Sequence, residues 1–134
     1  MVASTPGRRV WLWAPPLVYM AVIFYFSAQS DPMPVVTEHV WDKLLHTAEY
    51  LGLATLLFRA LYGEGLGRWQ AAILTVILAS GYGASDEWHQ AFVPMRSSDV
   101  QDWFADTFAA GMGAAASVLF VVSRPSRPRH RPRR

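Results

Sequence analysis

Four long apolar stretches constrain this chain more than any other feature of its sequence. They are Val10–Phe26, Leu44–Tyr62, Trp69–Ser85 and Phe104–Val122. A helix that crosses the hydrocarbon core of a membrane needs roughly 20 mostly apolar residues. None of the stretches shows the alternation of a barrel strand, so in lipid the helix is the structure that pairs every backbone polar group. We therefore predict an all-α integral membrane protein, a bundle of four transmembrane helices.

Composition supports a membrane location and a single domain. Only 16% of the 134 residues are charged, whereas soluble domains are about 25% charged. The absence of cysteine excludes disulfides, zinc–thiolate sites and thiol nucleophiles. The first stretch exceeds the ~7–15-residue core of a signal peptide, so we expect it to be retained. The expected organisation is an N-terminal segment at 1–9, a four-helix membrane domain at 10–122 and a disordered Arg/Pro-rich tail at 123–134.

Lysine and arginine residues are unevenly distributed between the predicted helix ends. With the N-terminus in the cytoplasm, ten of the twelve basic residues lie inside, and only Lys43 and Arg96 lie outside. Because basic residues concentrate on the cytoplasmic side of a membrane, we predict that both termini are cytoplasmic. The six arginines of the tail are expected to attract anionic membrane lipids. No nucleic acid partner is expected, because no aromatic or folded surface accompanies these arginines.

Acidic residues gather on the other predicted side, where nine of the ten fall. A charged side chain at the centre of a span costs ~2.5–3.5 kcal/mol, so Glu49 and Asp106 are expected to face the bundle interior. Helix caps, interfacial solvation or interhelical hydrogen bonds explain any one of these residues, and Asp99 follows two serines as at an ordinary helix start. Taken together, ionisable groups within a membrane indicate a functional site. The predicted site contains His46, Glu49, Asp86, Glu87, Gln90, Arg96, Asp102 and Asp106.

The chain resembles the VanZ-like family in an ordered set of motifs. These are Phe26-Ser27 with Ser30, Asp42-Lys43-x-x-His46-x-x-Glu49-Tyr50, Asp86-Glu87-x-x-Gln90-x-Phe92-x-Pro94-x-Arg96 and Asp102-x-x-x-Asp106. The resemblance covers roughly residues 26–113 and implies a multi-pass protein of the bacterial cytoplasmic membrane. The founding member is associated with teicoplanin resistance, so the resemblance implies a cell-envelope role without a defined chemical activity. One departure is Ala109-Ala110, where a glycine is expected after the second aspartate.

Three functions are open at this stage, of which we favour the first, with the second as the main alternative. The first is binding of an envelope ligand, either a lipid-linked wall precursor, a phospholipid head group or a glycopeptide antibiotic. Carboxylate, amide and imidazole groups match the hydroxyls and amides of such ligands. The residues expected to contact the ligand are Asp42, Lys43, Tyr50, Gln90 and Arg96. In the catalytic alternative that follows, the residues expected to extend the metal shell or act as general base are His46, Glu49, Asp86 and Glu87.

The second function is a membrane hydrolase or transferase that acts on a lipid-linked phosphate or diphosphate. The spacing of Asp99, Asp102 and Asp106 places three carboxylates along one helix face, where they would hold Mg²⁺ or another divalent cation. The third function is a structural or assembly role. A homo-oligomer is compatible with it, because every helix of a four-span chain keeps some surface facing lipid.

Overall fold

The chain folds into four α-helices. The computed structural model describes residues 5–30, 39–94, 98 and 100–123, with the side chains of residues 39–43 and 45 left out. The helices are α1 (Pro6–Ser27), α2 (His39–Gly63), α3 (Arg68–Gln90) and α4 (Val100–Ser123), and the described residues contain no strand. The all-α prediction is confirmed. At 1.5 Å per residue the shortest helix is about 33 Å long, enough to cross a hydrocarbon core.

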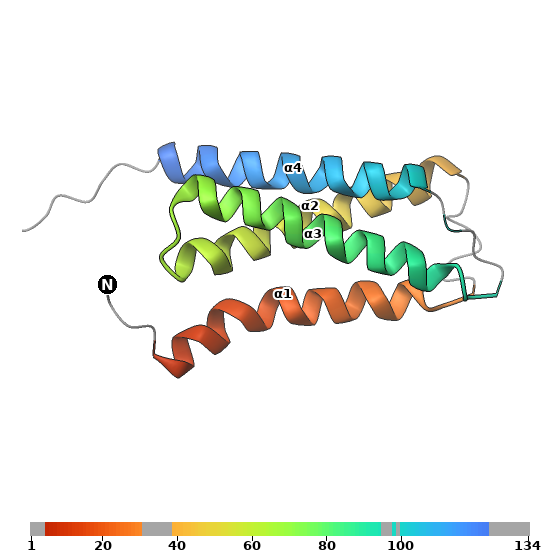
Figure 1. Ribbon diagram of the computed structural model, residues 1–134, viewed down its shortest axis with the longest axis horizontal. Helices are drawn as coiled ribbons and strands as arrows, with labels where there is room; N and C mark the ends of the chain where they lie inside the picture. Colours follow the sequence, from red (N-terminus) through yellow and green to blue (C-terminus); the bar gives the residue numbers. More distant parts are fainter. Residues whose placement is uncertain (1–4, 31–38, 95–97, 99, 124–134) are drawn as a thin grey trace, which may run out of the picture.

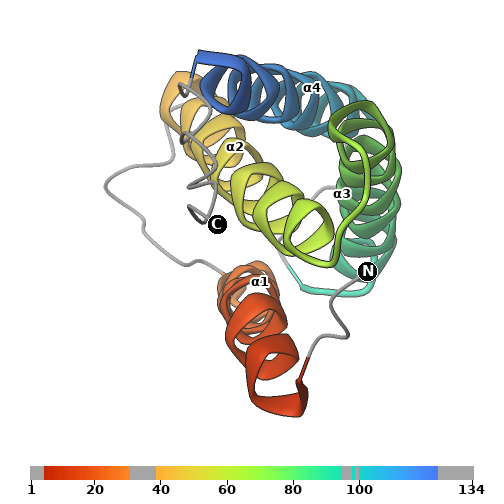
Figure 2. The same cartoon turned by 90° about the vertical axis from the view of Figure 1, so that its left-hand side faces the viewer.

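The helices lie side by side and alternate in direction along the chain (Figure 1). We call the end formed by Ser27, His39, Gln90 and Val100 the acidic end, and the end formed by Pro6, Gly63, Arg68 and Ser123 the basic end. Helices α2, α3 and α4 all pack against one another, whereas α1 packs mainly on α2. Figure 2 shows α1 set apart from the other three helices. Within the described helices, α1 makes no contact with α4.

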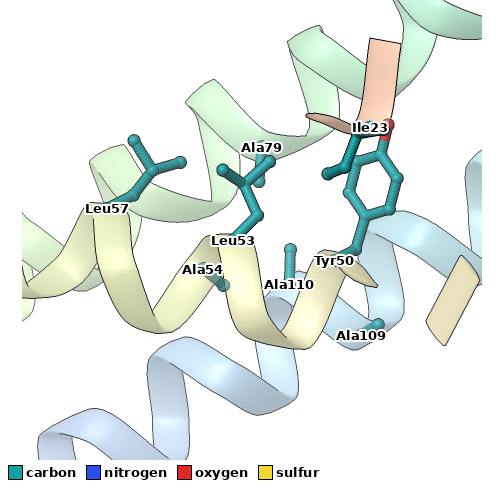
Figure 3. Close-up of a cluster of buried hydrophobic side chains, with 8 residues drawn as sticks. All are labelled: Ile23, Tyr50, Leu53, Ala54, Leu57, Ala79, Ala109 and Ala110. Atoms are coloured by element: carbon teal, nitrogen blue, oxygen red, sulfur yellow. The ribbon is translucent and has the colours of Figure 1, made fainter. Parts of the chain in front are cut away.

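Small residues allow α4 to approach α2 closely. Ala109 and Ala110 are fully buried in the main apolar cluster, where they face Tyr50 and Leu53 of α2 (Figure 3). A Cβ atom added at Gly113 would lie 2.8 Å from the backbone oxygen of Leu51. These small residues therefore let the backbones of α2 and α4 approach each other closely. The two alanines that depart from the family pattern do not prevent the contact, because Gly113 supplies the close approach.

Large apolar side chains cover much of the outer surface. Exposed fractions reach 62% at Ile73, 70% at Phe108 and 68% at Leu119. Extended apolar surface of this kind is unusual on a soluble monomer. Two helices, α1 and α4, are long and apolar enough by composition to cross a membrane. The other two predicted spans, at 44–62 and 69–85, remain predictions.

Some helix boundaries differ from those predicted. Helix α1 begins at Pro6, inside the expected N-terminal segment, since proline is well suited to the first turn of a helix. Helix α3 continues past the end of the predicted stretch at Ser85 to Gln90, so Asp86 and Glu87 lie within the helix. Their side chains are buried against neighbouring helices and do not end the helix. The chain turns between α2 and α3, with Gly65 at φ 102°. Of the expected tail at 123–134, Ser123 ends α4, and residues 124–134 lie outside the described residues.

Candidate functional site

The interior of the acidic end is polar. Five of the six buried polar side chains in the described residues lie there, with exposed fractions between 1% and 6%: Ser27, Asp86, Glu87, Gln90 and Asp106. They come from α1, α3 and α4. Burying a polar or charged group without a partner is costly in free energy. Each of these side chains therefore needs a hydrogen bond, and the carboxylates need in addition an opposite charge or a proton. The sequence prediction that Asp106 faces the bundle interior is in line with its burial.

Three helices contribute to one compact group of possible ligand atoms. His46 of α2, Glu87 of α3 and Asp106 of α4 each offer one nitrogen or oxygen atom, and these atoms all lie within 4.8 Å of one another. The Nδ1 atom of His46 lies 3.5 Å from Oδ1 of Asp106, and the two side chains are 12% and 2% exposed. We call these three residues the His–Glu–Asp cluster. Two buried carboxylates this close together repel each other unless a cation or a proton lies between them.

A hydrogen-bonded chain joins α1 to α3 in the same interior. Nε2 of Gln90 donates to Oγ of Ser27 at 2.9 Å and to Oδ2 of Asp86 at 3.3 Å. The other oxygen of Asp86, Oδ1, is buried without a hydrogen-bond partner within the described residues, and so are Oδ1 of Asp106 and the hydroxyl of Tyr50. Buried polar atoms without partners are rare in native proteins. Three such atoms in one interior indicate a place for a water molecule, an ion or a ligand.

Further hydrogen bonds connect α3 to α1 and to α4. The Tyr82 hydroxyl of α3 donates to the backbone oxygen of Met20 in α1 at 2.7 Å. Nε1 of Trp103 donates to the backbone oxygen of Ser80 at 3.1 Å, and the Ser80 and Thr107 hydroxyls are 2.8 Å apart. Trp103 lies half-buried between α3 and α4, where its indole N–H finds a backbone acceptor.

The structure places part of the predicted site together. The predicted residues buried or nearly buried at the acidic end are His46, Tyr50, Asp86, Glu87, Gln90 and Asp106. Glu49 and Asp102 are half-buried on α2 and α4. The side chains of Asp42 and Lys43, and all of Arg96 and Asp99, lie outside the described residues. Of the three aspartates predicted to hold a metal, Asp106 belongs to the His–Glu–Asp cluster, where His46 and Glu87 are its neighbours.

Sequence reasoning assigned no role to two residues that organise this interior. Ser27 bonds to a glutamine 63 positions away, and Tyr82 bonds to a backbone atom 62 positions away. Spacing along one helix cannot reveal partners on another helix. The Phe26-Ser27 motif was the available signal for Ser27, whereas no motif included Tyr82.

The donor atoms of the cluster are suited to a divalent cation. An imidazole nitrogen favours zinc and other transition ions, whereas carboxylate oxygens also accept magnesium and manganese. Three protein ligands leave coordination positions for water or substrate, as in catalytic metal sites. The arrangement can therefore hold a cation and present a reactive face toward a phosphate or carbonyl group.

Comparison with known proteins identifies the family. A family model described as VanZ/LLP1 matches residues 8–121, which include every residue of the His–Glu–Asp cluster. Comparisons with curated proteins and with solved structures find no match. The family match extends over most of the chain and agrees with the motif resemblance. The chain therefore belongs to the VanZ-like family.

Proposed function

We propose that this chain is a metal-dependent membrane hydrolase acting on the phosphate or diphosphate of a lipid-linked cell-envelope precursor. The observation that carries the proposal is the His–Glu–Asp cluster, in which three helices bring their ligand atoms within 4.8 Å in a buried interior. A bare acidic site would repel a phosphate. A divalent cation removes that repulsion and withdraws electron density from the phosphorus.

The membrane placement rests on the apolar surface. Helices α1 and α4 have the composition of spans, and α3 presents Ile73 and Ile77 outward with exposed fractions of 62% and 58%. All four helices are long enough to span. We propose four spans with the acidic end at the outer face, because arginines collect at the basic end. A lipid-linked substrate would then reach the cluster from the outer leaflet.

The surrounding side chains have distinct roles in this proposal. His46, Glu87 and Asp106 hold the cation. Asp86 is fixed by Gln90 through one oxygen, and its other oxygen is left to accept a proton from water. The water oxygen forms a bond to phosphorus, the bond from phosphorus to the leaving oxygen breaks, and the leaving oxygen takes up the proton that Asp86 accepted. Hydrogen bonding by Gln90 keeps Asp86 oriented for this transfer.

The first test measures metal binding. Purified chain in detergent is titrated with Mn²⁺, Zn²⁺ and Mg²⁺, and the bound metal is quantified by elemental analysis after desalting. We expect one ion per chain and loss of binding in Asp106→Asn and His46→Gln. Glu64→Gln is a matched control, since Glu64 is a partly buried carboxylate at the basic end, paired with Arg9 at 3.4 Å. Equal metal binding by Asp106→Asn and Glu64→Gln would contradict the proposal.

The second test measures the reaction. A polyprenyl diphosphate in mixed micelles is the probe, and released inorganic phosphate is the readout, with and without a chelator. We expect release that the chelator abolishes and that Asp86→Asn lowers while bound metal is kept. Retention of the lipid without release, unaffected by the chelator, would replace this proposal with direct hydrogen bonding of an envelope ligand by the acidic end.

A further inference from the structure

A groove lies at the basic end, far from the His–Glu–Asp cluster. It has a volume of about 1200 Å³ and is lined by residues of α1, α2 and α4. The groove forms because α1 and α4 do not contact each other, and both flank α2. Figure 2, which looks at this end, shows α2 lying between the two helices. The lining of the groove therefore comes from three helices that are distant in sequence.

Two arginines give the groove a positive rim. Arg8 donates to the backbone oxygen of Gly63, and the Arg59 guanidinium lies 3.7 Å from the centre of the Trp11 ring. Arg59 also donates to the backbone oxygen of Trp11 at 3.4 Å. Each guanidinium carries five N–H donors, so most of them remain available. Neither arginine forms an ion pair with a carboxylate in the part of the chain that the structure describes.

Glu64, an acidic residue close to the groove, is already engaged. Glu64 pairs with Arg9 at 3.4 Å and accepts a hydrogen bond from the Trp13 indole at 3.3 Å. It does not line the groove. The charge that faces the groove is therefore that of Arg8 and Arg59, and it calls for an anionic occupant.

Most of the remaining lining is apolar and includes Leu12, Phe58, Ala116, Phe120 and Val121. The hydroxyls of Thr55 and Ser117, which also line the groove, donate to backbone oxygens of their own helices. Hydrocarbon suits this lining, whereas a free phosphate or a polar peptide would leave it uncovered. A positive rim above an apolar groove between helices is the pattern that recognises the head groups of anionic lipids on the cytoplasmic side of a membrane.

We propose that this groove binds one anionic phospholipid. Arg8 and Arg59 contact the phosphate, in the charge-assisted manner that guanidinium groups favour. One acyl chain lies between α1 and α4 and fills the space that these helices leave. The lipid thereby joins α1 to the rest of the bundle. This proposal requires the membrane location, but it does not depend on the chemistry of the His–Glu–Asp cluster.

The test uses the full chain, purified in detergent and titrated with phosphatidylglycerol or phosphatidylcholine. Native mass spectrometry counts the lipids retained on each chain. We expect one phosphatidylglycerol retained at a lower concentration than phosphatidylcholine. Arg59→Gln should weaken retention of phosphatidylglycerol about fivefold, because one basic contact near the membrane surface contributes ~1 kcal/mol. Arg59→Lys should recover part of the loss, since it restores the charge.

Matched variants distinguish lipid binding in the groove from nonspecific attraction by charge and from the effect of any large substitution on the surface. Arg68→Gln removes an exposed arginine of the basic end that does not line the groove, so retention should not change. Ala116→Phe fills the groove, whereas Ala115→Phe adds the same side chain outside it, so only the former should lower retention. If Arg59→Gln does not fold, Arg8→Gln tests the same contact.

Three results would overturn the proposal. Equal retention of the two lipids would show that the phosphate contacts give no preference. An equal loss in Arg59→Gln and Arg68→Gln would show nonspecific attraction between charges. A dimer that retains no lipid and dissociates in Ala116→Phe would show that a second copy of the chain occupies the groove.

Discussion

At the residue scale, the central feature is a set of buried carboxylates, whose transfer out of water costs free energy. Asp106 is 1% exposed, and Asp86 and Glu87 are also buried. Asp106 is held by His46 of α2, whose Nδ1 lies 3.5 Å from Oδ1 of Asp106, whereas Asp86 is held by Gln90 of its own helix at 3.3 Å. Removing one partner leaves a buried polar atom without compensation. Such a loss costs more than the net contribution of the bond itself.

Gln90→Leu is therefore expected to destabilise the chain. The substitution removes the donor to both Ser27 and Asp86, and each buried acceptor left unpaired costs about 1–3 kcal/mol. Thermal unfolding in detergent measures the effect. Gln101→Leu is the control, because Gln101 is exposed on α4. Equal unfolding temperatures for the two variants would mean that the link from α1 to α3 through Gln90 contributes little.

At the element scale, the approach of α4 to α2 decides whether the cluster can form. Gly113 lies two turns beyond Asp106 on α4, and its backbone is close to Leu51 of α2. An ordinary side chain at this position would push the helices apart. Because His46 and Asp106 lie on these same two helices, the distance between them depends on this glycine contact.

Gly113→Ala is expected to lower the free energy of unfolding by about 1–3 kcal/mol, since its Cβ atom would lie 2.8 Å from the Leu51 oxygen. The same variant should weaken metal binding by moving Asp106 away from His46. Gly111→Ala is the matched control on the same helix, because nothing lies within 4 Å of an added Cβ there. It should be neutral or stabilising by up to ~1 kcal/mol. The pair is compared by thermal unfolding and by metal titration, and similar behaviour of both would contradict the packing argument.

At the scale of the whole molecule, charge is divided along the long axis. Buried carboxylates lie at the acidic end, whereas Arg8, Arg9, Arg59 and Arg68 lie at the basic end. This division predicts the orientation in a membrane, because the basic end should remain in the cytoplasm. It also places the proposed metal site and the proposed lipid groove on opposite leaflets.

Reporter fusions test this orientation. Alkaline phosphatase inserted in the segment 31–38 or at residues 95–97 should be active, since it would lie outside the cytoplasm. The same reporter at the C-terminus should be inactive, and a fluorescent protein fused there should be bright. Activity of the C-terminal phosphatase fusion would reverse the topology and move the His–Glu–Asp cluster to the cytoplasmic side.

The sequence alone determined the elements and part of the polar site. Apolar runs of span length predict helices because an unpaired backbone is too costly in lipid, and four helices are present. The cost of a charge in lipid predicted that Asp106 faces inward, and the ordered motifs identified the family. These inferences succeeded because each depends on a few consecutive residues and on the cost of placing polar groups in lipid.

Only the tertiary structure decided which of the acidic residues meet. Spacing along α4 favoured a set of three aspartates on one helix, whereas the compact group joins Asp106 to His46 and Glu87 from two other helices. The rotation and separation of packed helices arise from contacts such as that of Gly113 with Leu51, between residues 62 positions apart. A helical period specifies the face that a residue occupies. It carries no information about the neighbour that this face will meet, because that depends on how all the side chains fill the space between helices.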